Sequence, residues 1–482
     1  MAVTTKLLLA ILLSAFLVSA ANAVRDYQGQ QGQRGTRLTQ AQQCRLQRLT
    51  GSQPSDRIES EGGFTEVWDE NEEQFQCAGV APMRNVIRRN SLSLPNFHPM
   101  PRLVYIERGQ GILGITHPGC AETFQSQPQS FQAGREPREE RGQGRRGDQH
   151  QKVHRIRQGD VVAIPAGAAH WCYNDGEEEL VAVSINDLNH RSNQLDQNLR
   201  AFYLAGGVPQ SGRQRVQIGL RRQSTQRFQN IFRAFDTELM AEAFNIPQEL
   251  VRRMQEERSE RGLIVNVREG MQMVRPDEAE EEFEERPRRG QQWWEEAVGN
   301  GLEENICTMK IHTNMGHRRQ ADLFSRQAGK INHVNRQKLP ILKYMDMSAS
   351  KGTIYPNALM TPHWSVNGHC VVYVQRGDAQ VQVVDHSGQQ VMSDRVNQGE
   401  MFVVPQFFAS TLRAGQNGFE FVVFRTSGEP MNNQLAGYTS VIRAMPVEVL
   451  TNAYQISPNE AQRLKINRGG ESFLLSPQRR SS

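Results

Sequence analysis

Histidine and cysteine side chains stand at two places in the sequence where their spacing could hold a metal ion. The first is "GDVVAIPAGAAHWCYN", residues 159–174, which contains His170. The second is "HWSVNGHC", which begins with His363 and ends with Cys370. Imidazole nitrogen and thiolate sulfur are ligands of zinc and copper, and a catalytic ion needs about three protein ligands that converge on it. We therefore take His170, His363 and Cys370 as the candidate metal ligands.

The stretch around His170 has the form G-x5-P-x-G-x2-H-x3-N, which is similar to the second motif of the cupin family at every position. In metal-dependent cupins that histidine binds the ion, and a first motif, G-x5-H-x-H-x3–4-E-x6-G, supplies two more histidines and a glutamate. The upstream stretch departs from this first motif. It offers only His98, and Arg102 stands at the glutamate position, counted back from Gly109. A guanidinium group cannot bind a metal ion and repels it.

A weaker copy of both motifs follows in the second half of the chain. His363 stands for the first histidine, Ser365 replaces the second, and Cys370 occupies the glutamate position, counted back from Gly377. Ser410 replaces the histidine of the second motif. Because each copy keeps fewer than three ligands, we expect no cofactor, no dedicated metal site and no enzymatic activity. The alternative is a metal-dependent bicupin enzyme of the oxalate-degrading type, which the missing ligands disfavour.

The elements that would position these residues are duplicated. Three pairs of segments recur in the same order in the two halves, which indicates an internal repeat. The pairs are "VYIERGQG" (104–111) with "VYVQRGDA" (372–379), "QGDVVAIP" (158–165) with "QGEMFVVP" (398–405), and "ELMAEAFNI" (238–246) with "EVLTNAYQI" (448–456).

Each copy begins with short alternating strand patterns and then changes to helical spacing of its apolar residues. We therefore predict a mainly β protein of two cupin (jelly-roll β-barrel) domains, each followed by a small helical region. The first domain is expected over 24–266, with a disordered loop at about 121–152, and the second over 301–482. An acidic disordered linker, 267–300, joins them, because it is too rich in Glu, Arg and Gly to form a core.

The N-terminus predicts entry into the secretory pathway. Lys6 precedes the apolar run "LLLAILLSAFLVSA", and a small-residue cleavage site follows at Ala21–Ala23. This is the pattern of a signal peptide over 1–23, after which no membrane segment is expected. Such a compartment permits disulfides, and six cysteines allow 15 connectivities, so the spacing alone does not pair them.

Composition favours a nitrogen reservoir. The chain has 48 Arg and 48 Gln but only 8 Lys, and its formal net charge is +4. Solubility alone does not require Arg over Lys, whereas Arg and Gln share nitrogen-rich side chains. The small net charge and the lack of basic runs interleaved with aromatic residues argue against a nucleic-acid partner.

The segment "NGLEENIC", which begins at Asn300 between the two repeats, completes a resemblance. Together with the signal peptide and the two degenerate cupin copies, it resembles the legumin-type (11S) seed storage globulins over essentially the whole mature chain. The resemblance implies that an asparaginyl endopeptidase cuts Asn300–Gly301 into an acidic and a basic chain. The charges agree, since 301–482 holds 19 Lys and Arg against 13 Asp and Glu, and 24–300 holds 36 against 39.

The resemblance also implies two disulfides. One would join Cys44 to Cys77 within the acidic chain, and the other would join Cys120 to Cys307 and so tether the two chains. Cys172 and Cys370 are expected to be free and buried.

Assembly and location follow from the same resemblance. It implies a trimer of identical or related subunits that becomes a hexamer after cleavage, stored in the protein bodies of the seed vacuole. It also marks the chain as a candidate allergen.

Overall fold

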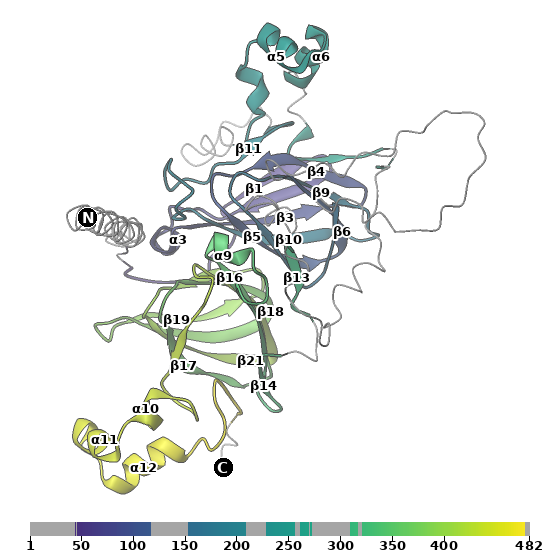
Figure 1. The fold of residues 1–482 in the computed structure, drawn as a ribbon. Helices are drawn as coiled ribbons and strands as arrows, with labels where there is room; N and C mark the ends of the chain where they lie inside the picture. Colours follow the sequence, from purple (N-terminus) through teal and green to yellow (C-terminus); the bar gives the residue numbers. More distant parts are fainter. Residues whose placement is uncertain are drawn as a thin grey trace, which may run out of the picture. The chain divides into compact units, whose positions relative to one another are not determined.

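A computed structural model describes residues 44, 46–116, 153–208, 228–255, 261–268, 270–271, 309–316 and 321–477. The chain divides into two compact units, Met1–Arg45 and Leu46–Ser482, and only Cys44 of the first is described. The predicted signal peptide and loop, Asn300 and Gly301 lie outside the described residues, as does most of the predicted linker. The second unit carries the fold drawn in Figure 1.

Two antiparallel sheets build the first barrel, as alternating strand patterns with turns between them require. One has the order β1 (Asp56–Ser60), β2 (Gly63–Val67), β3 (Val80–Ile87), β10 (Leu180–Asp187), β5 (Arg102–Arg108), β8 (Asp160–Ile164) and β13 (His312–Asn314). The other has the order β11 (Phe202–Tyr203), β4 (Ser91–Phe97), β9 (Ala169–Asn174), β6 (Gln110–Thr116) and β7 (Val153–Arg157), and β12 (Ile264–Asn266) pairs with β4.

The described strands of the second barrel form one ten-stranded sheet. Its path is β14 (Leu323–Ser325), β15 (Gly329–Val334), β16 (Ser348–Ile354), β21 (Ala409–Arg425), β17 (Leu359–Ser365) and β22 (Asn432–Gln434). Off this path, β18 (Cys370–Val384) pairs with β19 (Gln390–Asn397), β20 (Met401–Val404) and β21, and β23 (Leu474–Leu475) pairs with β17.

The predicted repeat is confirmed. The first repeated motif forms β5 and β6 in one half and the single long strand β18 in the other, and each carries a glycine at positive φ, Gly109 at 80° and Gly377 at 74°. A Cβ at Gly377 would lie 2.1 Å from the carbonyl oxygen of Gly418, so this close contact between neighbouring backbones requires glycine. The second motif forms β8 and β20, which pair with β5 and β18.

Helices follow each barrel, as the change of period predicted. They are α5 (Thr237–Phe244) and α6 (Gln248–Gln255) after the first barrel, and α10 (Val441–Ala444), α11 (Val447–Tyr454) and α12 (Pro458–Ile466) after the second. The remaining helical segments in the described part of the chain are α3 (Glu73–Ala78), η1 (Ile231–Ala234) and α9 (Leu342–Met345).

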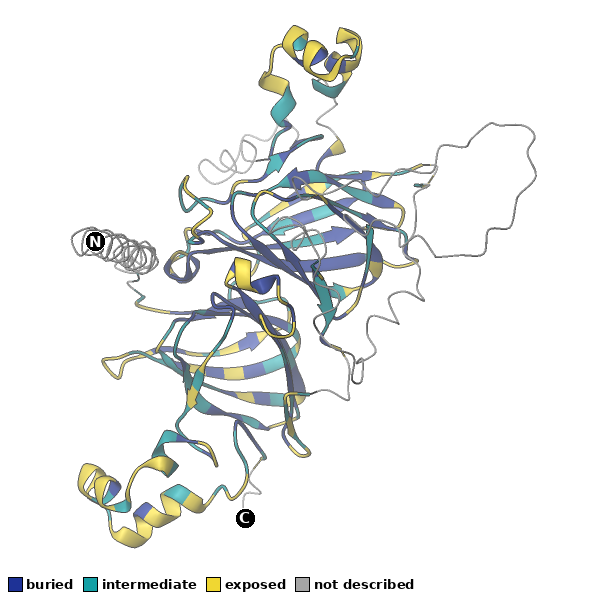
Figure 2. Cartoon of the chain, in the orientation of Figure 1, coloured by how far each residue is buried: buried dark blue, intermediate teal, exposed yellow. Residues whose placement is uncertain are grey.

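The two helical regions are alike in how their helices end and in how exposed their residues are. Asn245 after α5 and Gln455 after α11 both adopt the left-handed conformation that closes a helix, at φ of 53° and 55°. Figure 2 shows exposed residues concentrated on these helices, while the barrel strands carry the buried ones. None of the described helices is long and apolar enough to cross a membrane.

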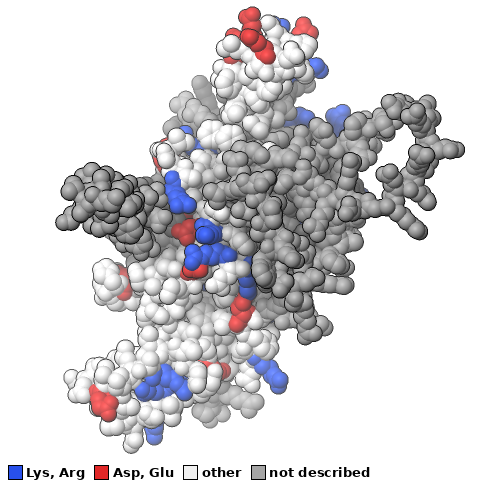
Figure 3. Space-filling model, in the orientation of Figure 1, with Lys and Arg blue, Asp and Glu red and all other residues white. Residues whose placement is uncertain are grey.

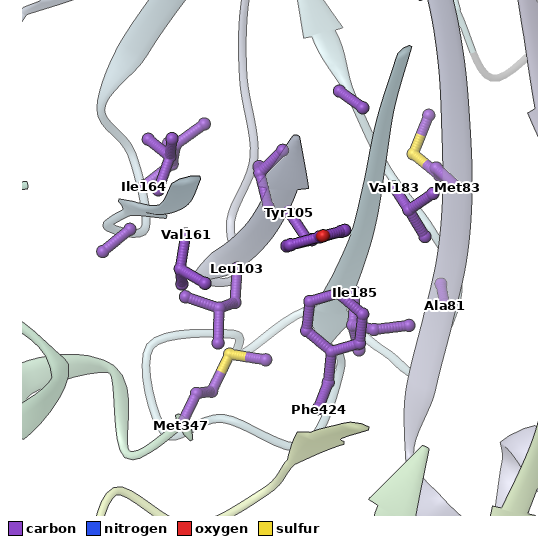
Figure 4. Close-up of a cluster of buried hydrophobic side chains, with 14 of the residues drawn as sticks. Ala81, Met83, Leu103, Tyr105, Val161, Ile164, Val183, Ile185, Met347 and Phe424 are labelled. Atoms are coloured by element: carbon purple, nitrogen blue, oxygen red, sulfur yellow. The ribbon is translucent and has the colours of Figure 1, made fainter. Parts of the chain in front are cut away.

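The two barrels of the second unit share part of their apolar core. One cluster of buried side chains includes Leu103 and Ile185 from the first barrel and Met347 and Phe424 from the second, and Figure 4 shows these side chains together. Since burial of an aliphatic or aromatic side chain stabilises by about 1.5–3 kcal/mol, this cluster fixes the barrels to each other.

Polar contacts between the barrels are reciprocal. The Tyr105 hydroxyl donates to Gln375 Oε1 at 3.4 Å, and the Tyr373 hydroxyl donates to Glu107 Oε2 at 3.1 Å. In the repeat, Tyr105 corresponds to Tyr373 and Glu107 to Gln375. Each copy therefore presents the same two positions to the other, as expected of two like domains related by a local two-fold axis.

The barrels also exchange short segments. β13 lies at the start of the second half of the chain, yet it pairs with β8 of the first barrel, with Thr313 opposite Val161. Conversely, Ser52 forms an antiparallel bridge with Met401 of β20, and Leu49 packs in the core of the second barrel. The predicted domain ranges did not anticipate this exchange.

Charged side chains of the described residues are mixed in sign on the face drawn in Figure 3. Many form exposed ion pairs, such as Arg89 with Glu177 and Arg57 with Glu59. Pairs of this kind contribute at most about 1 kcal/mol each, so packing and the β ladders dominate stability.

Candidate functional site

The first-barrel interior contains the residues that the cupin motifs singled out. Arg102, at the start of β5, is only 5 % exposed, and His98 and His170 are buried beside it. The two imidazole rings stack with their centroids 5.8 Å apart. The Arg102 Nε donates to Ser184 Oγ at 2.9 Å. The structure thus places a cation where a metal-dependent cupin would carry its glutamate.

Burial and this cation keep both histidines neutral. Desolvation, and then the charge of Arg102, lower the pKa of His170 to about 3 and hold the pKa of His98 well below its usual range. The Nδ1 of His170 contacts the carbonyl oxygen of Ala168 at 3.2 Å, so this nitrogen carries the proton. Burial also lowers the pKa of Arg102 itself, to about 10.

The second-barrel interior holds a cavity of about 240 Å³. His363, Ser365, Cys370 and Ser410, which occupy the four ligand positions of the cupin motifs in the second copy, all line it. The structure therefore brings together the residues that the sequence comparison aligned. Burial lowers the pKa of His363 to about 4, and its Nδ1 donates to the carbonyl oxygen of Thr361 at 2.9 Å.

Two further cavity residues were missed by the sequence analysis. Arg425, the last residue of β21, and His333, on β15, also line the cavity. The one available signal for Arg425 was a charged residue at the end of the apolar run "FEFVVF", where a buried strand is expected. The strand register then pairs Cys370 with Arg425, whereas in the first barrel Arg102 pairs with Asn186.

The candidate metal ligands do not form a common site. His363 and Cys370 share the second cavity with the guanidinium of Arg425, and His170 lies in the first barrel beside Arg102. Across the described ranges, no three His, Cys, Asp or Glu side chains gather in a way that could hold a metal ion. Because a buried guanidinium disfavours a cation, the residues in neither interior fit a cupin metal centre.

The described cysteines fall into two groups. Cys44 and Cys77 are each disulfide-bonded, and their pairing with each other stays a prediction. Cys172 and Cys370 are free thiols, as expected, but only Cys370 is buried, whereas Cys172 is partly exposed. Cys120 and Cys307 lie outside the described residues.

The fold and these two interiors define the class: the chain is a two-barrel cupin protein. The cupin family model matches residues 50–210 and 315–462. Those two ranges correspond to the two barrels described above, so the predicted fold class is confirmed.

Similar proteins identify the family within this class to which the chain belongs. The chain is 65 % identical to "11S globulin seed storage protein 2" of Sesamum indicum, over 92 % of this chain and 93 % of that protein. It resembles the crystal structure of the coconut allergen cocosin with a TM-score of 0.75 and 40 % identity, over 90 % of this chain and 100 % of that one. The 11S globulin from Wrightia tinctoria, a structure that reveals an auxin binding site in that protein, gives a TM-score of 0.76 and 36 % identity, over 90 % and 97 % of the two chains. The chain belongs to the 11S seed storage globulin family, as the sequence resemblance indicated.

Proposed function

We propose that this chain is a seed storage protein, a nutrient reservoir that holds nitrogen in the storage vacuole and has no enzymatic activity. The observation that carries the proposal is the 65 % identity to a seed storage globulin over nearly the full length of both chains. The 48 Arg and 48 Gln residues support it. The buried guanidiniums of Arg102 and Arg425 support it as well, because each stands where a metal-dependent cupin would need a cation to bind.

The proposal includes proteolytic processing. An asparaginyl endopeptidase would cut the secretory precursor between Asn300 and Gly301, and a Cys120–Cys307 disulfide would tether the products. The exchanged strand β13 supports a second tether. Asn314 Nδ2 donates to Asp160 Oδ1 at 2.7 Å and to the Gln158 carbonyl oxygen at 3.0 Å, in addition to the backbone ladder between β13 and β8.

Assembly into trimers and then hexamers is part of the same proposal. Large apolar side chains are exposed at equivalent positions of the two helical regions: Leu239 and Phe244 on α5, and Val449 and Tyr454 on α11. Exposed apolar clusters of this kind mark interaction surfaces. Two like surfaces on one subunit allow the helices of one copy to pack on those of the next, and such head-to-tail contacts close into a ring.

Protein extracted from the seed of the source plant tests storage and processing together. We expect abundant protein in mature seed that disappears on germination. A non-reducing gel should show one band near full size that splits on reduction into products the size of 24–300 and 301–482. Protein that is scarce in mature seed would contradict storage, and a band that reduction leaves whole would contradict processing.

Asn300→Gln tests the link between cleavage and hexamers. We expect this variant to remain a trimer after protease treatment, while the wild type forms hexamers, as measured by analytical ultracentrifugation. Asn417→Gln is the matched control, because Asn417 also precedes a glycine and is exposed, but lies within strand β21 rather than between the two repeats of the sequence. Equal hexamer formation by Asn300→Gln and wild type would overturn this link.

Metal analysis of the purified protein tests the enzymatic alternative. We expect far less than one transition-metal ion per chain. One ion per chain, held by three or more protein ligands, would instead favour the metal-dependent bicupin enzyme.

A further inference from the structure

The second-barrel cavity is large enough for a small organic molecule. Its volume of about 240 Å³ exceeds the roughly 150 Å³ of an apolar protein cavity that accommodates benzene. Most of its wall is apolar, and Val372, Phe402, Leu412, Phe421 and Phe473 contribute to it. Such a wall favours a ligand with an apolar, ring-sized body.

One fixed positive charge faces this cavity. Arg425 is 7 % exposed, and within the described ranges the one side-chain hydrogen bond of its guanidinium runs from Nη1 to the Ser350 hydroxyl. Its Nε is fully buried and has no hydrogen-bond partner. No carboxylate in the described part of the chain forms an ion pair with it. An unpaired buried guanidinium is costly, and a bound anion would compensate it.

The polar groups around Arg425 are also suited to an anion. The Ser350 hydroxyl accepts from Arg425, and it also shares a hydrogen bond of 2.6 Å with His333 Nδ1. Ser365 Oγ is buried, lines the same cavity and has no hydrogen-bond partner among the described residues. These groups supply hydrogen-bond donors, which a carboxylate needs and a metal cation cannot use.

We propose that the second barrel binds a small apolar carboxylate, with the carboxylate on the Arg425 guanidinium and the Ser365 hydroxyl, and with the apolar body among the side chains of the cavity wall. The proposal is independent of the storage role, because it rests on the contacts of Arg425 and the shape of the cavity alone. The first barrel is not expected to bind the same ligand, because there the Arg102 Nε already donates to Ser184.

Phenylacetate and its neutral analogue phenylacetamide are suitable probes for the full-length protein. By isothermal titration calorimetry, we expect one phenylacetate per chain and at least about tenfold weaker binding of the amide, the factor that 1.4 kcal/mol of ionic contact supplies. Arg425→Gln should abolish this preference. Arg102→Gln, the matched change in the other barrel, should leave it intact. Equal binding of acid and amide, no binding of either, or loss of the preference in Arg102→Gln would overturn the proposal.

The two free cysteines give a second measurement that needs no variant. Cys370 lines the cavity and Cys172 lies on β9 of the first barrel. Phenylacetate should slow alkylation of Cys370 at least about threefold in the wild-type protein, as followed by mass spectrometry, while alkylation of Cys172 is unchanged. Protection of Cys172 alone, or of neither thiol, would contradict the proposal even if Arg425→Gln does not fold.

Discussion

Among the described residues, each barrel interior contains one buried arginine, but the two arginines lie on different strands and have different consequences. In the first barrel Arg102 stands on β5, donates to Ser184 and lies beside two neutral histidines. In the second barrel Arg425 stands on β21, opposite Cys370, and leaves its Nε without a partner at the edge of a cavity. The same fold therefore excludes a cation from two interiors by placing the guanidinium on either of two neighbouring strands.

The difference also shows which position controls each interior. In the first barrel the arginine occupies a ligand position itself, so one substitution could restore the ligand set. In the second barrel the arginine lies across the register from the ligand position, so changing Cys370 would leave the positive charge in place.

Arg102→Glu should give the largest effect, because it should make the first barrel bind a metal ion while the second barrel still excludes one. It restores a carboxylate at the glutamate position beside His98 and His170, giving the three ligands that a catalytic metal site needs. We expect about one Co²⁺ or Zn²⁺ per chain with a Kd near 1 μM, worth about 8 kcal/mol, measured by metal analysis after dialysis and by cobalt absorption.

Cys370→Glu is the control for Arg102→Glu. It adds a carboxylate beside His363, but the Arg425 guanidinium remains and Ser410 supplies no imidazole. We expect no stoichiometric metal. If both variants bind metal equally well, the arginines do not control cation binding.

Acidification should destabilise both barrels by several kcal/mol, with a window that differs between them. The native pKa is about 3 for His170 and about 4 for His363, whereas an unfolded histidine titrates near 6.5. Below pH 6.5 the unfolded chain therefore binds more protons than the native one, and stability falls as the pH falls. Each histidine contributes a slope of about 1.4 kcal/mol per pH unit, which continues to about pH 4 for His363 and about pH 3 for His170.

The variants His170→Asn and His363→Asn test the contribution of each histidine by itself. Each should lower the pH dependence of the unfolding free energy by about one proton between pH 6 and 4.5, as measured by denaturant unfolding across that range. Comparison with the wild type cancels the contribution of the carboxyl groups. An unchanged slope in either variant would mean that the histidine titrates alike in native and unfolded protein.

Phe407→Gly should give the smallest effect. Phe407 has φ of 66°, and Gly167, its equivalent in the first barrel, has φ of 77°. A non-glycine residue in the left-handed conformation costs about 1–2 kcal/mol, and Phe407→Gly removes this cost. Because glycine loses more backbone entropy on folding, part of the gain is offset, and we expect the unfolding free energy to rise by about 0.5–1 kcal/mol. The Phe407 side chain is 62 % exposed, so little packing is lost.

Gly167→Phe provides the reverse test. A Cβ there would meet no atom within 4 Å, so only the backbone conformation opposes the change. A loss of about 1–2 kcal/mol in the unfolding free energy is expected. A loss in Phe407→Gly, or none in Gly167→Phe, would show that side-chain contacts outweigh the backbone at this turn.

Much of the fold was predictable because local sequence patterns determine it. The alternating strands, the change to helical period and the repeated glycine turns at Gly109 and Gly377 need only neighbouring residues to be recognised. The same holds for Arg102, His98 and His170, whose spacing within one motif placed them in one interior.

The features that the sequence did not predict depend on contacts between strands that are distant in the chain. Arg425 and His333 belong to no motif, and only the pairing of β21 with β18 and of β15 with β16 brings them to Cys370. β13 has just three residues, "HTN", with no apolar alternation, so its place in the first barrel could not be predicted. Strand register of this kind is set by the whole fold rather than by a local segment.

The exchange of segments between the barrels would change the kinetic order of folding, from unimolecular to bimolecular, once the backbone is cut as proposed. In the precursor, β13 finds β8 within one molecule, at the high effective concentration that a covalent linker provides. If the chain is cut after Asn300 as proposed and the proposed tether is reduced, the same pairing becomes a bimolecular step whose rate depends on protein concentration. Under the proposed processing, the unfolded uncut chain should therefore recover its structure at a rate independent of its concentration, whereas recovery of the cut and reduced chains should slow as they are diluted.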